Sequence, residues 1–201
     1  MAMNRGGRIR LAAESDASAI GAIYRPIVAG TAISFETDPP TDQEIARRIL
    51  VTVPEYPWLV YEHDGMIAGY AYAGRFRPRP AYRWSVETSA YVHEKFRERG
   101  VGFGLYQSLF AVLGAQGFAN AFAGIALPNP ASIRLHERTG FVHIGVYRNV
   151  GHKFGRWHDV GWWQCAIQAA RTAAPREPIA IGSDGTNWQA LLEVGLKAIR
   201  A

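Results

Sequence analysis

One short segment between a predicted strand and a predicted helix combines arginine with closely spaced glycines. It reads Arg97-x-x-Gly100-x-Gly102-x-Gly104. Glycines let the backbone approach a ligand closely, and consecutive N–H groups at a helix N-terminus form a nest for phosphate oxygens that the helix dipole reinforces. We therefore interpret the segment as a candidate pyrophosphate cradle. A glycine-rich helix start without a ligand is the alternative, and the arginines beside the glycines count against it.

The spacing of these glycines restricts which phosphate compound the segment could bind. A dinucleotide fingerprint requires glycine where Leu105 stands, and a Walker motif requires a Gly-Lys-Ser/Thr sequence that the segment lacks. The sequence therefore favours neither NAD nor ATP.

Glu87 is a charged residue inside a mostly apolar predicted strand, residues 85–92. Side chains alternate between the two faces of a strand, so Glu87 shares its face with Ser89 and Tyr91. An apolar environment would raise the pKa of this carboxyl group toward the range of a general base. An ion pair with Arg83 or another neighbouring arginine is an equally good interpretation of the residues alone.

The positive charge of the chain is concentrated in residues 75–99. The whole chain has a formal net charge of +5, and this segment carries seven basic and three acidic residues, a net +4. The basic residues are Arg75, Arg77, Arg79, Arg83, Lys95, Arg97 and Arg99. We expect the segment to face an anion, either a small ligand or a nucleic acid.

The composition is that of a folded globular protein, with 201 residues, 48% hydrophobic and 19% charged, which suits one domain plus a tail. The chain contains no apolar run long enough to span a membrane, and its N-terminus lacks the apolar run of a signal peptide, so we expect a cytoplasmic protein. Cys165 is the single cysteine, which excludes an internal disulfide or a zinc knuckle. His152 and His158 lack the spacing of a known metal site, and we expect no metal.

Hydrophobic periodicity and capping residues predict a mixed sequence of strands and helices. Ser15 is expected to cap the first helix, and Thr41 with Glu44 to form a capping box on the second. The predicted strands are residues 9–12, 58–61, 67–73, 85–92, 119–126, 141–148 and 159–167; the predicted helices include one that follows the glycine segment and a short one over 131–138.

The C-terminal part of the chain differs in composition from the rest. We predict a domain over residues 1–168, a linker over 169–185 rich in Pro, Ala and Gly, and an amphipathic helix over 186–201 opened by Thr186 and Gln189. Docking of this helix on its own domain is favoured over a contact between subunits.

The glycine segment and a second block together resemble the two cofactor-binding motifs of the GNAT superfamily of N-acetyltransferases. The second block is Asn129-x-Ala131-Ser132-x-x-Leu135-His136-Glu137-x-x-Gly140-Phe141. Four blocks in order are similar to the phosphinothricin N-acetyltransferase branch, which includes enzymes acting on methionine sulfoximine and methionine sulfone. These blocks are residues 83–89, 127–129, 134–137 and 153–161. The resemblance covers roughly residues 8–168.

The resemblance implies an α/β (α+β) fold with a central mixed β-sheet that splays apart, acetyl-CoA as the acetyl donor, and a homodimer. It implies that main-chain groups of Ala90, Tyr91 and Val92 bind the pantetheine arm. It further implies that Asn129, Ser132 and His136 lie near the coenzyme. The pyrophosphate residues that it implies are Arg97, Glu98, Arg99, Gly100, Val101, Gly102 and Gly104.

The resemblance also assigns catalytic roles. It favours Glu87 as the base that deprotonates the amine, through a water molecule. His136 stands where most of the superfamily has a tyrosine that protonates the thiolate, and a hydrogen-bonded structural role is the alternative for it. Candidate acceptor-binding residues are Arg75, Arg77, Arg79, Phe35, Tyr82, Trp84 and Lys153, together with Glu87. A guanidinium fork suits a carboxylate or phosphinate, although at least one of the three arginines is expected to be solvated.

The sequence thus predicts an enzyme that N-acetylates a small amino acid or its phosphinate or sulfoximine analogue. A non-catalytic acyl-CoA sensor would keep the glycine segment and make Glu87 dispensable. A basic module that binds nucleic acid would use the arginines of 75–99, but the glycine segment would have no role in it.

Overall fold

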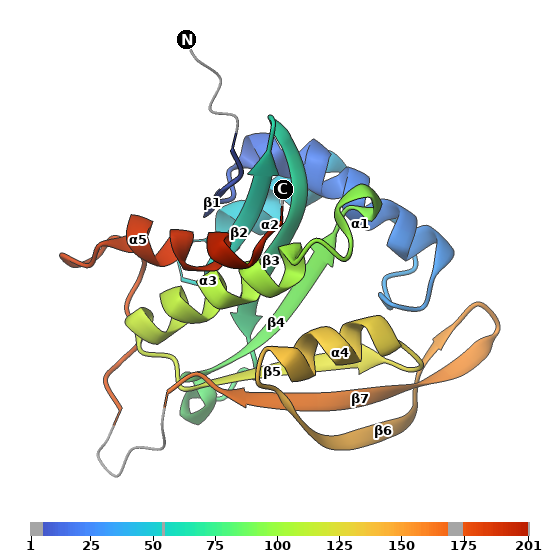
Figure 1. Ribbon diagram of the computed structural model, residues 1–201. Helices are drawn as coiled ribbons and strands as arrows, with labels where there is room; N and C mark the ends of the chain where they lie inside the picture. The colour runs from blue at the N-terminus through green and yellow to red at the C-terminus, as the bar shows by residue number, and fades with distance from the viewer. Residues whose placement is uncertain (1–5, 54, 169–174, 201) are drawn as a thin grey trace.

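The computed structural model describes residues 6–53, 55–168 and 175–200, and within them a single open sheet runs in the order β1-β2-β3-β4-β5-β7-β6 (Figure 1). The strands are β1 (Arg8–Leu11), β2 (Trp58–His63), β3 (Met66–Arg75), β4 (Ser85–Val92), β5 (Asn120–Ala126), β6 (Val142–Lys153) and β7 (Arg156–Ala166). The helices are α1 (Ala17–Gly30), α2 (Asp42–Thr52), α3 (Val101–Gln116), α4 (Pro130–Arg138) and α5 (Trp188–Glu193). Short 3-10 turns are η1 (Glu14–Asp16), η2 (Pro80–Tyr82), η3 (Glu94–Phe96) and η4 (Val194–Ala198).

The sheet splays at its centre, where β4 and β5 form its parallel pair. Their register comprises Ser85 with Asn120, Val86 with Ala121 and Glu87 with Phe122. Beyond Glu87, β4 continues to Val92 paired with β3, while β5 continues paired with β7. The two strands therefore separate just after Glu87, and the predicted splayed mixed sheet is confirmed.

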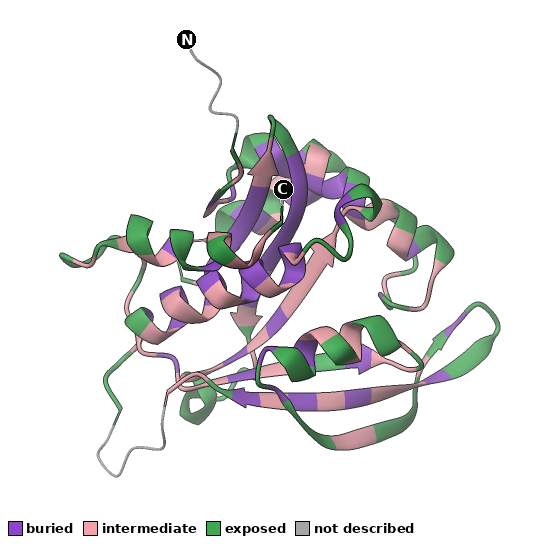
Figure 2. Cartoon of the chain, in the orientation of Figure 1, coloured by how far each residue is buried: buried purple, intermediate pink, exposed green. Residues whose placement is uncertain are grey.

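Helices cover the two faces of the sheet because the strands alternate their apolar side chains. Trp58 and Val60 of β2 pack in one core cluster with residues of α1 and α2. Leu59 belongs to the other cluster, with Leu105 and Leu109 of α3. Figure 2 shows the buried positions concentrated on the central strands and on α3.

The predicted strands and helices form, but the capping of the first, second and C-terminal helices differs from the prediction. Ser15 lies inside η1 and caps nothing; α1 begins at Ala17, and the Asp16 carboxylate accepts a hydrogen bond from the N–H of Ala13 at 2.8 Å. The Thr41 hydroxyl accepts from the N–H of Glu44 at 3.2 Å, as predicted. The Glu44 carboxylate is held by Arg47 and Arg48 and does not complete a capping box.

The hairpin of β6 and β7 is longer than the sequence predicted. Its turn at Phe154 and Gly155 has φ values of 51° and 72°, and the strands run from 142 to 153 and from 156 to 166. Much of β6 is exposed, so the burial pattern that marks a strand in sequence is weak there.

The C-terminal segment lies along α3, red beside green in Figure 1. Its helix α5 is capped by Asn187, whose side chain accepts from the N–H of Ala190 at 3.2 Å, and not by Thr186. Residues 169–174 of the predicted linker lie outside the described residues, and the boundaries at 168/169 and 185/186 stay a prediction. Among the residues that the structure describes, no helix is long and apolar enough to cross a membrane.

Candidate active site

The turn from β4 into α3 presents a run of unpaired main-chain donors. Within the described residues, the N–H groups from Glu98 to Phe103 donate to no protein acceptor. The N–H of Gly104 differs, because it donates to the Gly100 carbonyl at 2.8 Å and closes the first turn of α3. Glu98 has a φ of 62° and Gly100 a φ of 84°, a pair of left-handed residues that turns the chain into the helix. The arrangement is a nest for an anion at a helix N-terminus.

The three predicted glycines face two different sides of α3. A Cβ on Gly102 would lie 3.0 Å from Leu135 of α4 and 3.6 Å from Val92 of β4, so Gly102 faces the splayed side of the sheet. Gly100 and Gly104 face the C-terminal segment instead. Of the three glycines, only Gly102 thus leaves the side of the nest that faces α4 free of a side chain.

The other residues expected at the coenzyme surround this nest. Ala90, Tyr91 and Val92 lie on β4 past the splay, where β4 pairs with β3 and has no register with β5. Arg97 and Arg99 are exposed. The site thus offers main-chain N–H groups, space beside Gly102 and the positive charges of Arg97 and Arg99. These features fit a diphosphate.

Asn129 and His136 organise α4, which borders the nest through Leu135. The Asn129 side chain accepts from the N–H of Ser132 at 3.1 Å and caps the helix. His136 is 5% exposed, and both of its ring nitrogens make hydrogen bonds. Its Nδ1 lies 2.8 Å from the Ser132 carbonyl oxygen, which can only accept, so Nδ1 carries the proton and Nε2 accepts from the Tyr106 hydroxyl at 2.8 Å.

The environment of His136 favours the neutral ring. Burial lowers the pKa of His136, and the Ser132 carbonyl opposes this effect only in part. The side chain therefore has no free N–H directed away from the protein at neutral pH.

A cavity of about 440 Å³ opens beside Glu87. It is lined by Ile33, Ser34, Phe35, Glu87, Tyr91, Gly124, Ala126, Tyr147, Val150, Val160 and Trp162. Its wall comes from the α1–α2 loop and from β4, β5, β6 and β7, and it brings together three predicted site residues, Phe35, Glu87 and Tyr91.

Glu87 has no hydrogen bond or ion pair with any described residue. Burial raises the pKa of the Glu87 carboxyl, and the positive charge of Arg77 opposes this shift. The alternative ion pair with Arg83 does not form, because Arg83 binds Glu177 at 2.9 Å. The carboxylate is thus half-buried in the cavity without a fixed partner.

Of the three arginines expected at the acceptor, Arg77 lies nearest to this cavity. Its Cζ is 4.3 Å from the centre of the Phe76 ring and 5.5 Å from that of Trp162, which lines the cavity. Arg75 donates to the main-chain carbonyls of Arg77 and Pro78, and so folds back onto its own loop. Arg79 is exposed at the start of η2.

The remaining acceptor candidates occupy supporting or peripheral places. Lys153 is buried, which lowers its pKa, and its Nζ donates to the carbonyls of Val28 at 2.7 Å and Ser34 at 2.8 Å. It therefore ties the loop that carries Phe35 to β6. Tyr82 is 42% exposed, and the Trp84 indole N–H donates to the Arg176 carbonyl at 2.7 Å.

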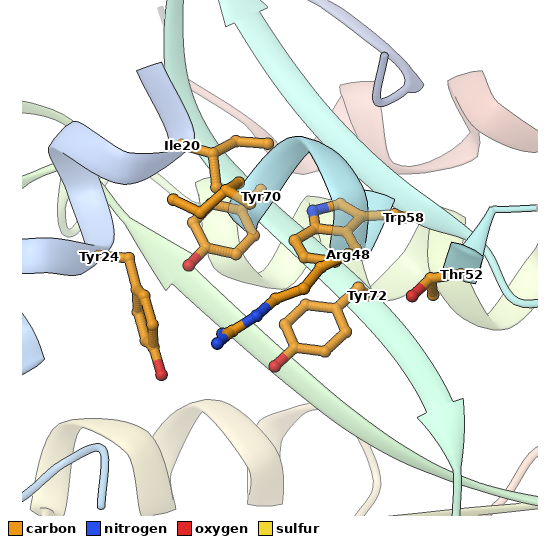
Figure 3. Close-up of a pocket in the computed structure, with 8 residues that line it drawn as sticks. Ile20, Tyr24, Arg48, Thr52, Trp58, Tyr70 and Tyr72 are labelled. Atoms are coloured by element: carbon orange, nitrogen blue, oxygen red, sulfur yellow. The ribbon is translucent and has the colours of Figure 1, made fainter. Parts of the chain in front are cut away.

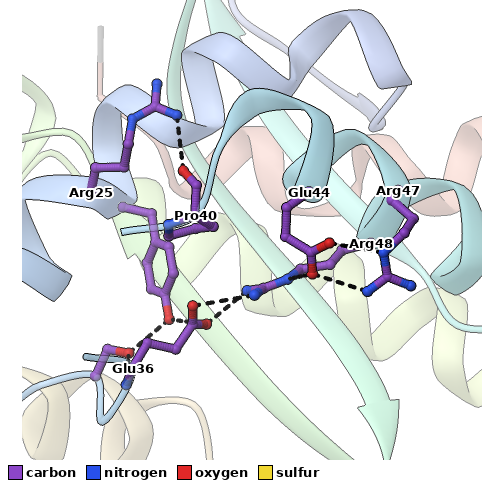
Figure 4. Close-up of polar contacts among 8 residues, drawn as sticks. Arg25, Glu36, Pro40, Glu44, Arg47 and Arg48 are labelled. Atoms are coloured by element: carbon purple, nitrogen blue, oxygen red, sulfur yellow. Dashed lines mark hydrogen bonds and ion pairs between the residues drawn. The ribbon is translucent and has the colours of Figure 1, made fainter. Parts of the chain in front are cut away.

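A second hollow of about 140 Å³ is lined in part by Tyr24 and Tyr70, whose rings contact that of Tyr91, and sequence reasoning did not identify its residues as site residues. Tyr24, Arg48 and Tyr72 direct their polar ends to one side of it (Figure 3). Arg48 holds Glu36 at 2.7 Å, and Glu36 accepts from the Tyr24 hydroxyl at 2.9 Å (Figure 4). The tyrosine alternation on β3 could have indicated this face, whereas nothing in sequence relates Glu36 to Arg48.

No group of three or more His, Cys, Asp or Glu side chains suited to a metal occurs in the described part of the chain.

Known proteins match the chain over most of its length. The profile of the acetyltransferase (GNAT) domain matches residues 9–162. The phosphinothricin N-acetyltransferase of Streptomyces viridochromogenes is 39% identical over 171 residues, covering 85% of this chain and 93% of that protein. The L-methionine sulfoximine/L-methionine sulfone acetyltransferase of Salmonella typhimurium is 37% identical over 168 residues, covering 83% of this chain and 97% of that protein.

A solved structure matches across the same region. The phosphinothricin acetyltransferase of Sinorhizobium meliloti, crystallised in complex with AcCoA, has a TM-score of 0.80 and 34% identity, covering 86% of this chain and 95% of that one. The chain belongs to the GNAT acetyltransferase family. The predicted fold, the N-acetyltransferase class and the branch that the motifs resemble are confirmed.

Proposed function

We propose that this enzyme transfers the acetyl group of acetyl-CoA directly to the amino group of a small amino acid or analogue of the phosphinothricin, methionine sulfoximine or methionine sulfone type. The observation that carries the proposal is the run of unpaired N–H groups from Glu98 to Phe103, at the end of the same strand that places Glu87 in a cavity. The relatives named above support the acceptor class.

The coenzyme half of the site consists mainly of backbone. The N–H groups from Glu98 to Phe103 bind the pyrophosphate, with Arg97 and Arg99 adding positive charge. Main-chain groups of 90–92 hold the pantetheine arm along the splay. Acetyl-CoA supplies an acetyl group activated as a thioester.

Glu87 is the general base. An amino acid reaches the enzyme as an ammonium ion, which must lose a proton before its nitrogen can attack a carbonyl carbon. The raised pKa of Glu87 makes its carboxylate a better proton acceptor than an exposed one, and a water molecule in the cavity carries the proton to it.

His136 acts as a positioning residue in this scheme. Its bond to Ser132 lies within α4, its bond to Tyr106 joins α4 to α3, and Leu135 on α4 packs against the Gly102 side of the nest. The acid role that the resemblance implied for His136 stays a prediction.

The acceptor half supplies charge and aromatic surface. Arg77 faces the carboxylate, phosphinate or sulfoximine end of the acceptor, while Phe35 and Trp162 contact its carbon chain. Lys153 acts indirectly, by holding the loop on which Phe35 sits.

A homodimer belongs to the proposal. Apolar side chains of the β6–β7 hairpin are at least half exposed, and a second copy would cover them. They are Val142, Ile144, Tyr147, Val150, Phe154 and Trp157. Tyr147 and Val150 also line the cavity, so dimerisation would complete its wall. The cytoplasmic location and the absence of a nucleic-acid partner stay predictions.

A steady-state assay tests the function. Release of coenzyme A thiol from acetyl-CoA is measured with methionine sulfoximine, methionine sulfone, phosphinothricin and a set of ordinary amino acids. We expect turnover with at least one of the analogues. Tight binding of acetyl-CoA without turnover of any amine would instead favour a sensor, and steeply salt-dependent binding of nucleic acid without coenzyme binding would overturn the proposal.

A further inference from the structure

The C-terminal segment contacts the outside of the nest, and the matched family domain ends before it, at residue 162. The Arg200 N–H donates to the Arg99 carbonyl at 2.8 Å, and the Arg200 guanidinium donates to the Glu98 carbonyl at 2.8 Å. These contacts join residues about one hundred positions apart in the chain. They fall on the two peptide units that precede Gly100.

The two carbonyls fix the direction of two of the proposed coenzyme-binding N–H groups. In a trans peptide the C=O and the following N–H share one plane and point in opposite directions. The Glu98 carbonyl therefore sets the direction of the Arg99 N–H, and the Arg99 carbonyl sets that of the Gly100 N–H. Because Arg200 holds both carbonyls on its own side, both N–H groups point away from the C-terminal segment.

Close packing places the segment on α3 with little freedom. The Ser108 hydroxyl donates to the Leu192 carbonyl at 2.6 Å and accepts from the Gly195 N–H at 3.0 Å. A Cβ on Gly195 would overlap the Gly104 carbonyl, and a Cβ on Gly100 would overlap the Ala198 carbonyl. The absence of side chains at Gly100, Gly104 and Gly195 thus lets the segment lie directly on the backbone of the nest and of the first turn of α3.

We infer that the C-terminal segment positions the pyrophosphate nest from its outer side through Gly195 and Arg200, and that Arg200 is the positioning residue that orients the Arg99 and Gly100 N–H groups. This inference rests on the proposed function. It gives the C-terminal segment a role in coenzyme affinity, without contact to the acceptor cavity.

Two variants disturb the contact, each with a matched control. Arg200→Ala removes the bond to the Glu98 carbonyl, and Lys197→Ala removes the same charge from an exposed side chain of the same segment that has no described partner. Gly195→Ala pushes the segment away from Gly104, whereas Gly185→Ala adds the same methyl group in open space.

The measurement is the Kd of coenzyme A by isothermal titration, together with the thermal unfolding of the coenzyme-free protein. We expect the Kd to rise about threefold to tenfold in Arg200→Ala, which loses one hydrogen bond, and by about tenfold in Gly195→Ala, where the added methyl has no room. Both controls should bind like the wild type. At saturating acetyl-CoA the KM for the amine should not change, because the segment does not reach the cavity.

The outcomes separate the two proposals. If the wild type does not bind coenzyme A, the proposed function fails. If the wild type binds coenzyme A and Arg200→Ala binds it equally well, the result for Gly195→Ala completes the test. When Gly195→Ala also binds with the wild-type Kd, or does not fold, the inference is overturned and the proposed function stands. A lowered melting temperature with unchanged Kd well below that temperature would show a purely structural role and would also overturn it.

Discussion

The proposed coenzyme half and the proposed acceptor half of the site are built in different ways. The nest from Glu98 to Phe103 consists of main-chain N–H groups on one continuous stretch of chain, and its requirements are a backbone conformation and space. The acceptor cavity takes side chains from the α1–α2 loop and four strands. A backbone nest tolerates many side chains, whereas each wall residue of the cavity changes what fits. Under the proposed function, coenzyme binding therefore depends on one local stretch of chain, whereas the choice of acceptor depends on side chains from several elements.

The two halves also differ in what stabilises them. The nest is held from outside by Arg200 and from the α4 side by Leu135. The loop of the acceptor half is held by charged contacts, Lys153 with the Ser34 carbonyl and Arg48 with Glu36. Substitutions in one half should therefore leave the other half's binding constant unchanged, and each prediction below is a way to break or sharpen that separation.

The largest effect is expected for Glu87→Gln. Loss of the base should lower kcat by about 10²-fold or more, with the Kd of coenzyme A unchanged. Since burial raises the pKa of Glu87 above its ordinary 4.5, the wild-type pH profile of kcat/KM should have an acid limb above that value, which the variant lacks.

Stability provides the control for this variant. A carboxyl whose pKa is raised by folding stabilises the fold at low pH and loses that contribution as pH rises through the folded pKa. The neutral amide should therefore leave the unfolding free energy at pH 7 unchanged or increase it. A kcat close to that of the wild type would remove Glu87 from the mechanism.

On the coenzyme side, Gly102→Val should have the next largest effect. The new side chain would press on Leu135, where a Cβ already lies 3.0 Å away, and should raise the Kd of coenzyme A by about tenfold or more. Gly114→Val in the same helix is the control, since a Cβ there meets Ile167 at 3.6 Å. Equal affinities for the two variants would contradict a nest that opens on the Gly102 side.

The sequence indicated the nest better than the walls of the cavity for a physical reason. Backbone binding requires glycines at fixed spacing before a helix, which is a local pattern, and the alternation of 85–92 placed Glu87 correctly on β4. Yet the sequence could not show that Gly100 and Gly104 serve the C-terminal segment, because that contact joins distant parts of the chain. For the same reason the sequence did not indicate the ion pair between Arg48 and Glu36. It also did not indicate that the Arg75 guanidinium would bind the carbonyls of its own loop.

Within the acceptor half, Arg48→Met tests whether the charged network positions the loop that carries Phe35. Arg48 is half-buried and joins α2 to Glu36, so its loss should raise the KM for the amine about threefold to tenfold while leaving the Kd of coenzyme A unchanged. Arg47→Met is the control, because Arg47 binds the same Glu44 without touching Glu36. A similar KM in both variants would show that the pair with Glu36 does not position the acceptor.

The smallest expected change is the shift of the pH profile in Arg77→Gln, which tests how the charge of Arg77 acts on the pKa of Glu87. The positive charge of Arg77 lowers the pKa of Glu87 against the effect of burial, so its removal should move the acid limb of kcat/KM to higher pH. Arg79→Gln removes the same charge from an exposed side chain and should leave the limb in place. If the acid limb of kcat/KM moved equally in both variants, the shift would reflect the net charge of the protein. If it moved in neither variant, Arg77 would act on the acceptor alone. Because a pKa shift leaves the plateau rate intact while a lost acceptor contact raises KM at every pH, the profile separates the two roles of this guanidinium.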